Sequence, residues 1–486
     1  MGQTLVEKII GKNVGHPVKA GETVIVNVDF AALHDGSGPL MVRLLKERAY
    51  DKDPVFDPNR MLFANEFGPE STREVANEHA LCRCYALEHG CHWEEGGTGH
   101  VHAHIYESFL KCGTVCIVGD SHTTVHGAYG CFATGCGSTD MVAVTRFGKT
   151  WIKVPETFRI NVEGALPKGV YSKDIMLKLA SIIKSDQAIY KSLEFRGSTI
   201  SSLSMEGRLT ITSMGVDVGA KNAIMETDEH TREYLKIFGR ENDYLEVKGD
   251  EEANYERVIN IDATQLEPLV SKPHYVENVD LARNCSSEHV NMVFIGSCTN
   301  GRVEDLHIAA DILRGKKVAK GTRLLVIPNS NYVYQQCMRD GTLLTLAEAG
   351  AMIEAPNCGP CMGVHQGIPA DNEVVAATQN RNFGCGSSRE IAAIIIKLAG
   401  VGAVLSKSFG RIFYRNAINN GMLLIECDTD RIEEGDELFV DVKNRVIRKI
   451  NDLAFSMPFT LSEKEIKIVN EGGLLNYIEN HNSLDI

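Results

Sequence analysis

The chain has 486 residues, of which 43% are hydrophobic and 23% charged, and its net charge is −14. This length suits two to four domains, and an acidic surface argues against a nucleic-acid binder or a protein that coats an anionic membrane. No apolar run reaches membrane-spanning length and no secretory signal is visible, so we expect a soluble cytoplasmic protein with no membrane or nucleic-acid partner.

Short β-branched runs alternate with helical patterns along the chain. Expected strands lie at 23–31, 114–120, 290–297, 323–329 and 402–408, and expected helices at 332–351 and 389–400. This alternation predicts α/β layers around largely parallel sheets. Polar, glycine-bearing turns follow several strands, at 119–122, 296–300 and 329–331. Because ligands bind beyond the carboxyl ends of such strands, we expect these turns to converge on one cleft.

Two further segments have distinctive patterns. Residues 228–262 are highly charged, which favours an exposed segment or a connection between domains. The last hundred residues read as a small α/β unit, with a hairpin at 436–450 that turns near Asn444 and a helix that begins near Ser462.

Three cysteines carry the strongest chemical signal. Cys298 lies in "GSCTNGR", and Cys358 and Cys361 form a C-x-x-C pair in "APNCGPCMG". Three thiolates are one short of a closed structural zinc site, and they suit an iron–sulfur cluster with one iron left open. The alternative is a redox pair, or a zinc site that takes His365 or another cysteine as its fourth ligand.

Two other motifs contain candidate site residues. In "VGDSHTT", Asp120 and His122 follow an apolar strand and can form a carboxylate–imidazole pair, although His122 could merely cap a loop. In "GCGSSRE", glycines and a helix start favour an anion, and Arg389 adds a bidentate carboxylate binder. Ser387 and Ser388 are either helix caps or, for one of them, a catalytic group.

Together with "HDGSGPL" near the start and "NRNF" before the serine motif, these segments resemble the aconitase superfamily of iron–sulfur hydro-lyases. That family includes aconitase, homoaconitase and isopropylmalate isomerase. The resemblance implies aconitase-like three-layer α/β/α domains around a cluster, followed by a truncated C-terminal swivel-type domain. We expect two domains in residues 1–285, a third in 286–383 and the swivel-type domain in 384–486.

The resemblance also assigns roles to residues. It implies a [4Fe–4S] cluster on Cys298, Cys358 and Cys361, with Ser387 as the base that removes the proton from carbon. The other implied residues are catalytic Asp120, His122, His100 and Glu194, and substrate-binding Arg381, Arg389, Asn380, Ser121 and Ser388. The expected reaction is reversible dehydration of a hydroxy-di- or tricarboxylate such as citrate, homocitrate or isopropylmalate. The expected assembly is either a homo-oligomer or a complex with a small subunit.

The sequence departs from the family pattern at two places. Ala64 and Asn65 occupy the position of an Asp-His pair that protonates the leaving hydroxyl, and Val101 replaces a glutamine. At Phe383, "NRNF" runs directly into "FGCGSSRE", so the start of the swivel-type domain is missing. These departures leave two alternatives to an active enzyme, which are a pseudoenzyme or cluster-dependent binding protein, and an internal deletion that leaves an incomplete fold.

Overall fold

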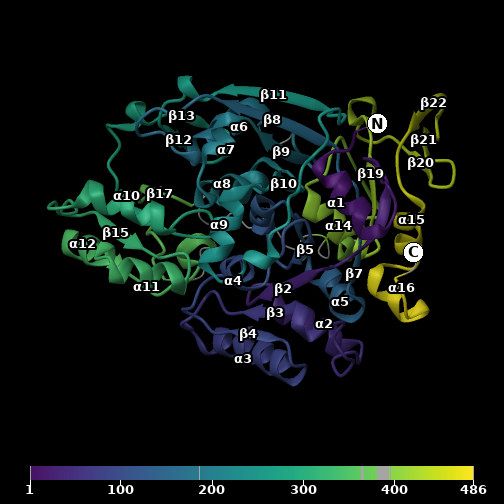
Figure 1. The fold of residues 1–486 in the computed structure, drawn as a ribbon. Coiled ribbons are helices and arrows are strands. Elements are labelled where there is room, and N and C mark those ends of the chain that lie inside the picture. The colour runs from purple at the N-terminus through teal and green to yellow at the C-terminus, as the bar shows by residue number, and fades with distance from the viewer. Residues whose placement is uncertain (1, 185–186, 363–365, 380–392, 394–395, 485–486) are drawn as a thin grey trace.

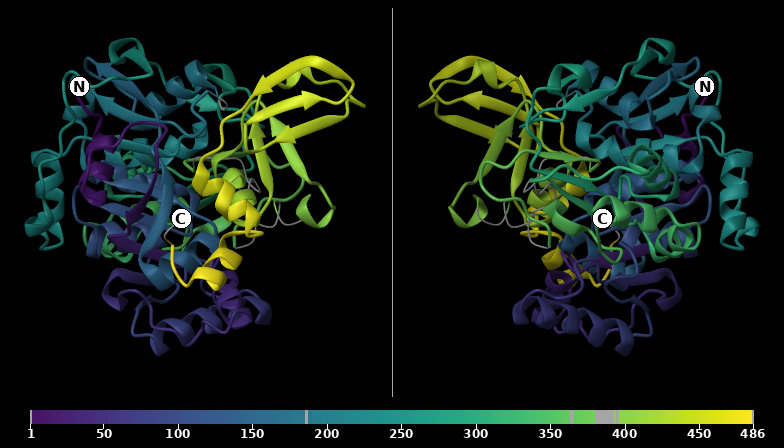
Figure 2. Two further views of the ribbon diagram at one scale, coloured as in Figure 1. Left: turned by 90° about the vertical axis from the view of Figure 1, so that its right-hand side faces the viewer. Right: turned by 90° about the vertical axis from the view of Figure 1, so that its left-hand side faces the viewer.

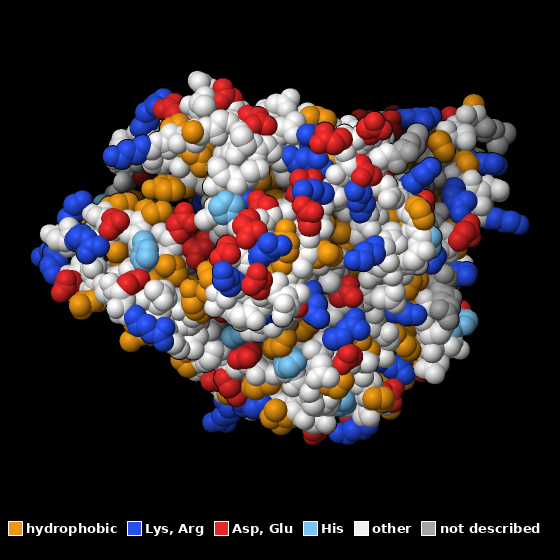
Figure 3. All heavy atoms as spheres, in the orientation of Figure 1, with side chains coloured by type: hydrophobic (Ala, Val, Ile, Leu, Met, Phe, Trp, Pro, Cys, Tyr) orange, Lys and Arg blue, Asp and Glu red, His pale blue; other side chains and the backbone are white. Residues whose placement is uncertain are grey.

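The structure is a computed structural model, and it describes all residues except 1, 185–186, 363–365, 380–392, 394–395 and 485–486. Its three larger sheets are parallel, with helices packed around them (Figure 1), which confirms the predicted α/β class. Among the described residues, no helix is both long and apolar enough to span a bilayer. Acidic and basic side chains are interspersed over the face in Figure 3.

The first sheet has five parallel strands in the order β4-β3-β2-β5-β6. The central strands β2, β3 and β5 are buried along their whole length, as expected for a parallel sheet covered on both faces. Their carboxyl ends bring the segments with His34, Glu66 and Asp120 to one edge. The elements are β2 (Phe30–His34), β3 (Met61–Ala64), β4 (His92–Glu94), β5 (Val115–Val118) and β6 (Phe132–Gly135), with α2 (Gly38–Glu47), α3 (Arg73–Glu88), α4 (Val101–Ser108), η2 (Ser121–Tyr129) and α5 (Ser138–Phe147).

The second sheet has the order β10-β9-β8-β11, again parallel. The charged segment 228–262 contains a helix and the edge strand of this sheet, so it is more than an exposed connection. The elements are β8 (Thr157–Glu163), β9 (Ser192–Arg196), β10 (Asn222–Met225) and β11 (Arg257–Asp262), with α6 (Ser172–Ile183), α7 (Ser198–Ser202), α8 (Met205–Ser213), η3 (Met214–Val218) and α9 (Glu229–Ile237). The short strands β12 (Leu269–Ser271) and β13 (Val279–Leu281) pair antiparallel.

The third sheet has the order β16-β15-β14-β17. The helix predicted at 332–351 is in fact two helices, because Gly341 adopts a positive φ of 82° that ends one helix before the next begins. The elements are β14 (Met292–Ile295), β15 (Arg323–Val326), β16 (Met352–Ile353) and β17 (Val375–Ala377), with α10 (Val303–Leu313), α11 (Asn331–Arg339) and α12 (Thr342–Ala349).

The strand predicted at 23–31 is also two strands in different sheets. β1 (Thr23–Asn27) pairs antiparallel with β7 (Lys149–Lys153), whereas β2 belongs to the first sheet. The chain changes sheet at Val28, whose N–H donates to the Gly148 carbonyl, and Asp29, whose N–H donates to the Val115 carbonyl. The N-terminal helix α1 (Leu5–Val14) precedes them.

Among the described residues, the C-terminal region from 403 onward combines two small sheets with three α-helices. The predicted hairpin is confirmed, and the Asp441 carboxylate accepts the Asn444 N–H in its turn. Ser462 caps α15, as expected. Figure 2 shows the three-stranded sheet projecting from the rest of the molecule. The elements are β18 (Ala403–Ser406), β19 (Leu423–Glu426), β20 (Leu438–Asp441), β21 (Val446–Lys449) and β22 (Asp452–Pro458), with α14 (Arg411–Asn419), α15 (Glu463–Asn470) and α16 (Leu474–His481).

This region shares a hydrophobic core with the first sheet. Trp151 of β7 and Ala143 of α5 pack among its buried residues, such as Ile418 and Tyr477. The Trp151 indole N–H also donates to the Asn419 side chain at 3.2 Å. The C-terminal residues are therefore held against the N-terminal part of the chain and do not form a detached unit.

Candidate active site

The three predicted cysteines meet at the carboxyl edge of the third sheet. Cys298 follows β14, and Cys358 and Cys361 lie at the short helix η7 (Gly359–Met362). Burial raises the pKa of the Cys358 thiol well above its usual value, and the charges of Glu66, Cys361, Cys298 and Asp120 raise it further. The Cys358 thiol therefore lies near the other two thiols and near two carboxylates from the first sheet.

The loops that carry these thiols are held by specific hydrogen bonds. The Arg302 guanidinium donates to the carbonyls of Cys298 at 2.9 Å and Thr299 at 2.5 Å. Gly359 adopts a positive φ of 55°, and a Cβ there would lie 2.5 Å from the Ile327 side chain. The C-x-x-C turn therefore needs glycine at this position.

The donor set fits a multi-iron cluster better than one zinc ion. A single tetrahedral zinc with bonds of about 2.3 Å would draw its sulfur ligands close together. Within the part of the chain that the structure describes, the sulfurs of Cys298, Cys358 and Cys361 do not all lie within 4.8 Å of one another. The Cys358 N–H donates to the Glu66 carbonyl at 2.9 Å, which ties the trio to the first sheet.

Asp120 is the centre of the polar network beside the cysteines. Its Oδ1 accepts hydrogen bonds from the His122 backbone N–H and the His102 Nε2, both at 2.7 Å. Burial would raise the pKa of Asp120, but the hydrogen bond to His102 and the charges of His102, His34 and His122 hold it well below its usual value. The site therefore keeps a carboxylate against imidazole groups.

His122 and Ser121 lie together on η2, directly after Asp120. The Ser121 hydroxyl and His122 Nδ1 are 3.2 Å apart, and His122 Nε2 faces Asp217 Oδ1 at 3.5 Å. Asp217, in η3, was not predicted as a site residue. The glycine-bearing segment "TSMGVDVGA" around it matches no catalytic motif, and the packing of η3 against η2 reveals the pair.

His100 lies between α4 and the third sheet. It caps α4 by accepting the Ala103 N–H at Nδ1, and its Nε2 contacts the Asn329 amide nitrogen at 2.7 Å. Asn329 in turn donates to the Ser297 carbonyl, next to Cys298. Burial lowers the pKa of His100 well below its usual value, as do the charges of His102 and Arg302, so its ring is neutral. The predicted convergence of the turns at 296–300 and 329–331 is therefore observed.

His34, at the end of β2, is a second site residue that the sequence analysis does not predict, although it belongs to the motif "HDGSGPL". Its Nδ1 lies 3.0 Å from Glu66 Oε1, and its Nε2 lies 3.7 Å from Asp120 Oδ2. Burial alone would lower its pKa, but Glu66, Asp35 and Asp120 raise it to about 10. A buried imidazolium therefore faces the carboxylates of the site.

Glu194 does not join this network. It is fully buried on β9, where its carboxylate accepts the Leu5 N–H at 2.9 Å and the Tyr255 hydroxyl at 2.7 Å. It also forms an ion pair with Arg196. These bonds tie the start of α1 to the second sheet. The catalytic role of Glu194 stays a prediction, and Asp217 is a carboxylate found beside His122.

The remaining predicted residues lie outside the described part of the chain. They are Asn380, Arg381, Ser387, Ser388 and Arg389, together with the alternative zinc ligand His365.

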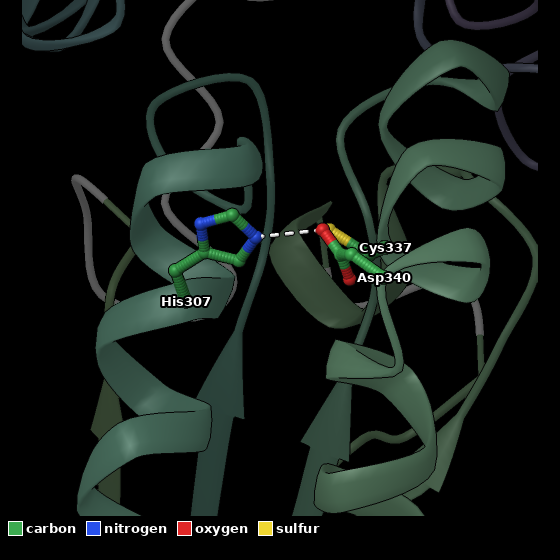
Figure 4. A group of neighbouring side chains, drawn as sticks. All are labelled: His307, Cys337 and Asp340. Carbon is green, nitrogen blue, oxygen red and sulfur yellow. Dashed lines mark hydrogen bonds and ion pairs between the residues drawn. The ribbon is translucent and has the colours of Figure 1, made fainter.

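A separate group of ligand-type side chains lies on the third sheet's helices (Figure 4). His307 of α10 pairs with Asp340 at 2.8 Å, and the Cys337 thiol of α11 lies beside them. The second Asp340 oxygen accepts the Thr342 N–H at the start of α12, and burial raises the pKa of Cys337 to about 12. Both carboxylate oxygens already accept hydrogen bonds and the thiol is protonated, so this group is a hydrogen-bonded contact that joins helices.

Comparisons with known proteins agree with this geometry. The sequence matches the family described as Aconitase family (aconitate hydratase) over residues 7–283 and 275–397. The chain belongs to the aconitase family. The family's C-terminal domain also matches, over residues 370–430. The predicted superfamily and its fold are therefore confirmed, and this chain is a hydro-lyase of that family.

Curated relatives of this aconitase-family chain are large subunits. The 3-isopropylmalate dehydratase large subunit of Elusimicrobium minutum is 47% identical over 384 residues, which cover 79% of this chain and 91% of the relative. A large subunit of the same name from Archaeoglobus fulgidus is 44% identical and covers 79% of this chain and 92% of the relative. The methanogen homoaconitase large subunit of Methanocaldococcus jannaschii is 40% identical, with coverages of 78% and 92%.

Proposed function

We propose that this chain catalyses the reversible removal and re-addition of water on a hydroxy-di- or tricarboxylate, with substrates of the isopropylmalate or homocitrate type favoured over citrate. The arrangement of Cys298, Cys358 and Cys361 at one sheet edge, with the Cys358 N–H bound to the Glu66 carbonyl, carries the proposal. The names of the relatives, which are 3-isopropylmalate dehydratase and homoaconitase large subunits, support the substrate class.

Cys298, Cys358 and Cys361 would hold a [4Fe–4S] cluster. When bound, such a cluster supplies a Lewis acid for the substrate hydroxyl and carboxylate. The protein supplies the rest of the site. Asp120 orients His102 and stays ionised, and His122 is held between Ser121 and Asp217. Ser387 remains the proposed base at carbon, and Arg381 and Arg389 the proposed carboxylate binders.

Asn65 supports a site that receives a polar ligand. Asn65 is 1% exposed, and neither its side-chain oxygen nor its side-chain nitrogen has a hydrogen-bond partner among the described residues. A buried amide without partners costs stability, so such groups usually face a ligand or an ordered water. Asn65 stands where the family has its Asp-His pair, next to Glu66, and it is placed to bind the substrate or the departing water.

The C-terminal region would supply the second half of the site in the same chain. It packs on α5 and β7 through a shared core, and the family's C-terminal domain matches part of it. We expect the isolated chain to turn over substrate without an added small subunit. A chain that gains activity only when a small subunit is added would contradict this part of the proposal.

The test is an anaerobic reconstitution followed by an activity screen. Purified protein is loaded with iron and sulfide, its cluster is quantified, and hydration of cis-aconitate, homoaconitate and isopropylmaleate is followed by loss of the conjugated double bond's absorbance. We expect turnover with at least one homologue of aconitate. Cluster-loaded protein that hydrates none of the three contradicts the proposal.

A second candidate function is ligand binding without turnover. It is favoured by Ala64 and Asn65 at the position of the missing Asp-His pair, since loss of a general acid costs roughly 10²–10⁴ in rate. Calorimetry of the cluster-loaded chain with isopropylmalate and homocitrate separates the two functions. Binding without any turnover favours the second candidate, and efficient turnover excludes it.

A further inference from the structure

A chain of alternating carboxylates and histidines runs from the surface to the site. Its outer end is Glu70, in the segment before α3, whose side chain is 34% exposed. Glu70 Oε1 contacts His79 Nδ1 at 2.9 Å, and His79 Nε2 contacts Asp35 Oδ2 at 2.9 Å. Asp35 Oδ1 then lies 3.5 Å from His34 Nδ1, and His34 Nε2 faces Asp120 Oδ2 at 3.7 Å.

The inner members of this chain are closed off from solvent. The His79 and Asp35 side chains are each 1% exposed. Burial would lower the pKa of His79, but hydrogen bonds to Asp35 and Glu70 raise it. Burial would raise the pKa of Asp35, but its contacts with His34 and His79 lower it. The charges therefore alternate along the whole path, and each histidine has a partner on both ring nitrogens.

His34 has partners for both of its protonation states. When Nδ1 carries a proton, it faces the carboxylates of Glu66 at 3.0 Å and Asp35 at 3.5 Å. When Nδ1 gives that proton up, its lone pair can accept the Gly36 backbone N–H, whose nitrogen lies 3.1 Å away. His34 can therefore hold or release this proton without leaving Nδ1 unpartnered.

The other branch from Asp120 does not lead outward. His102 Nε2 binds Asp120, and His102 Nδ1 contacts His126 Nε2 at 3.3 Å. His126 is wholly buried, and its Nδ1 has no hydrogen-bond partner among the described residues. Among the described residues, the branch through His34 and His79 reaches an exposed group, and the branch through His102 and His126 does not.

We propose that Glu70, His79, Asp35 and His34 form a proton relay between solvent and the site, which takes over the task of the missing Asp-His pair. This rests on the proposed hydro-lyase function. In dehydration, the His34 Nδ1–H bond breaks and an O–H bond forms on the leaving hydroxyl, which departs as water. His34 Nδ1 then regains a proton from Asp35, and Asp35 regains one from His79 Nε2. The His79 ring must then reorient, so that its bare nitrogen meets Glu70 and takes a proton from solvent through that carboxylate. The proton taken from carbon returns to solvent, and hydration reverses every transfer.

The first test replaces His79, which is remote from the reacting atoms and acts through Asp35 and His34. In holoenzyme with His79→Ala, we expect kcat to fall about 10²-fold, at the low end of the effect of losing an acid–base group. KM and iron content should stay the same, and added imidazole should restore kcat at least in part. Glu70→Gln should cause a smaller loss, since solvent can protonate His79 in its place.

His89→Gln is the matched control, because His89 ends the same helix and its Nδ1 contacts the Tyr85 carbonyl outside the relay. It should leave kcat unchanged. A His79→Ala enzyme with normal kcat overturns the relay. So does a reduced kcat that imidazole does not restore in protein with intact cluster and unchanged thermal unfolding.

The second test does not depend on turnover. Exchange of the histidine C2 hydrogens with deuterium, followed residue by residue by mass spectrometry, gives the pKa of each imidazole. Asp35→Asn should lower the pKa of both His34 and His79, and Glu70→Gln should lower that of His79. Unchanged values overturn the relay. If these pKa values shift as expected but the protein hydrates no substrate, the hydrogen-bonded network is supported and the proposed function is contradicted.

Discussion

Arg415 of α14 binds Asp140 of α5 through both carboxylate oxygens, at 3.1 Å from Nε to Oδ2 and 2.5 Å from an amino nitrogen to Oδ1. Both side chains are buried, and Arg415 also donates to the Trp151 carbonyl and the Thr150 hydroxyl. The guanidinium lies over the Trp151 ring at 4.0 Å. This pair fixes the C-terminal region on the N-terminal sheet.

Replacement of Arg415 by Met should leave the Asp140 carboxylate buried without its partner. The expected loss is about 3–5 kcal/mol of unfolding free energy, as for other broken buried pairs. Chemical denaturation measures it, and limited proteolysis should show earlier cleavage of the C-terminal region. The exposed pair Arg445–Glu463 is the control, and Arg445→Met should cost no more than about 1 kcal/mol from that pair. Equal losses in both variants would contradict a docking role for Arg415.

Replacement of Cys298 by Ser should remove one of the three proposed cluster ligands. Iron and acid-labile sulfide, measured after anaerobic reconstitution, should fall by more than half, because serine lacks the soft thiolate that binds iron–sulfur clusters. Cys427, which is half-buried in the C-terminal region, is the matched control. Cys427→Ser should keep the full iron content. If Cys298→Ser retains the wild-type cluster, the assigned ligand set is wrong.

Asp120→Asn should reduce kcat by about 10² or more with little change in KM, since the neutral amide no longer stabilises the His34 imidazolium that faces it. Steady-state kinetics on cluster-loaded protein gives both constants. Iron content should be unchanged, which separates a catalytic effect from loss of the cluster. Wild-type kcat in this variant would show that Asp120 is not part of the reacting site.

Glu194→Gln distinguishes the structure from the family-based prediction. Because Glu194 binds Arg196, Tyr255 and the Leu5 N–H, we expect a loss of about 1–3 kcal/mol in stability. Its kcat should equal that of the wild type. A kcat reduced by about 10² with unchanged stability would restore the predicted role beside the cluster.

The raised pKa of His34 also predicts how stability depends on pH. Its value is 6.5 when unperturbed and about 10 in the fold, where Glu66, Asp35 and Asp120 face it. The stabilisation by its bound proton is fully present below pH 6.5 and is lost as the pH rises to about 10. The difference in unfolding free energy between wild type and His34→Gln should therefore shrink over that range. A constant difference would show that His34 stays neutral.

The sequence predicted the α/β class, the parallel sheets and the C-terminal hairpin, because these follow from local periodicity and turn residues. It misplaced two boundaries. The run 23–31 has uniform β propensity, and only pairing shows that it enters two sheets. The run 332–351 has continuous helical periodicity, and the positive φ of Gly341 divides it.

For the site, the sequence named Cys298, Cys358, Cys361, Asp120 and His122 because short motifs specify chemistry and turn geometry together. It missed Asp217, His34 and His79, whose neighbours are distant in the chain. His79 lies 44 residues after Asp35 in the chain. The packing of α3 against the end of β2 brings His79 Nε2 to 2.9 Å from Asp35 Oδ2. No local pattern encodes such a contact, because it depends on how α3 lies against the first sheet.

The sequence alone thus determined which thiols and carboxylates this hydro-lyase has, since their spacing is a covalent property of the chain. The tertiary structure decided which of them meet. It brought Glu66 and Asp120 to the cysteines and tied Glu194 to the N-terminus. It also seated Arg415 on Asp140. A buried charge is costly unless it is paired, and its partner comes from a distant part of the chain. Which residues pair is therefore set by how distant elements pack.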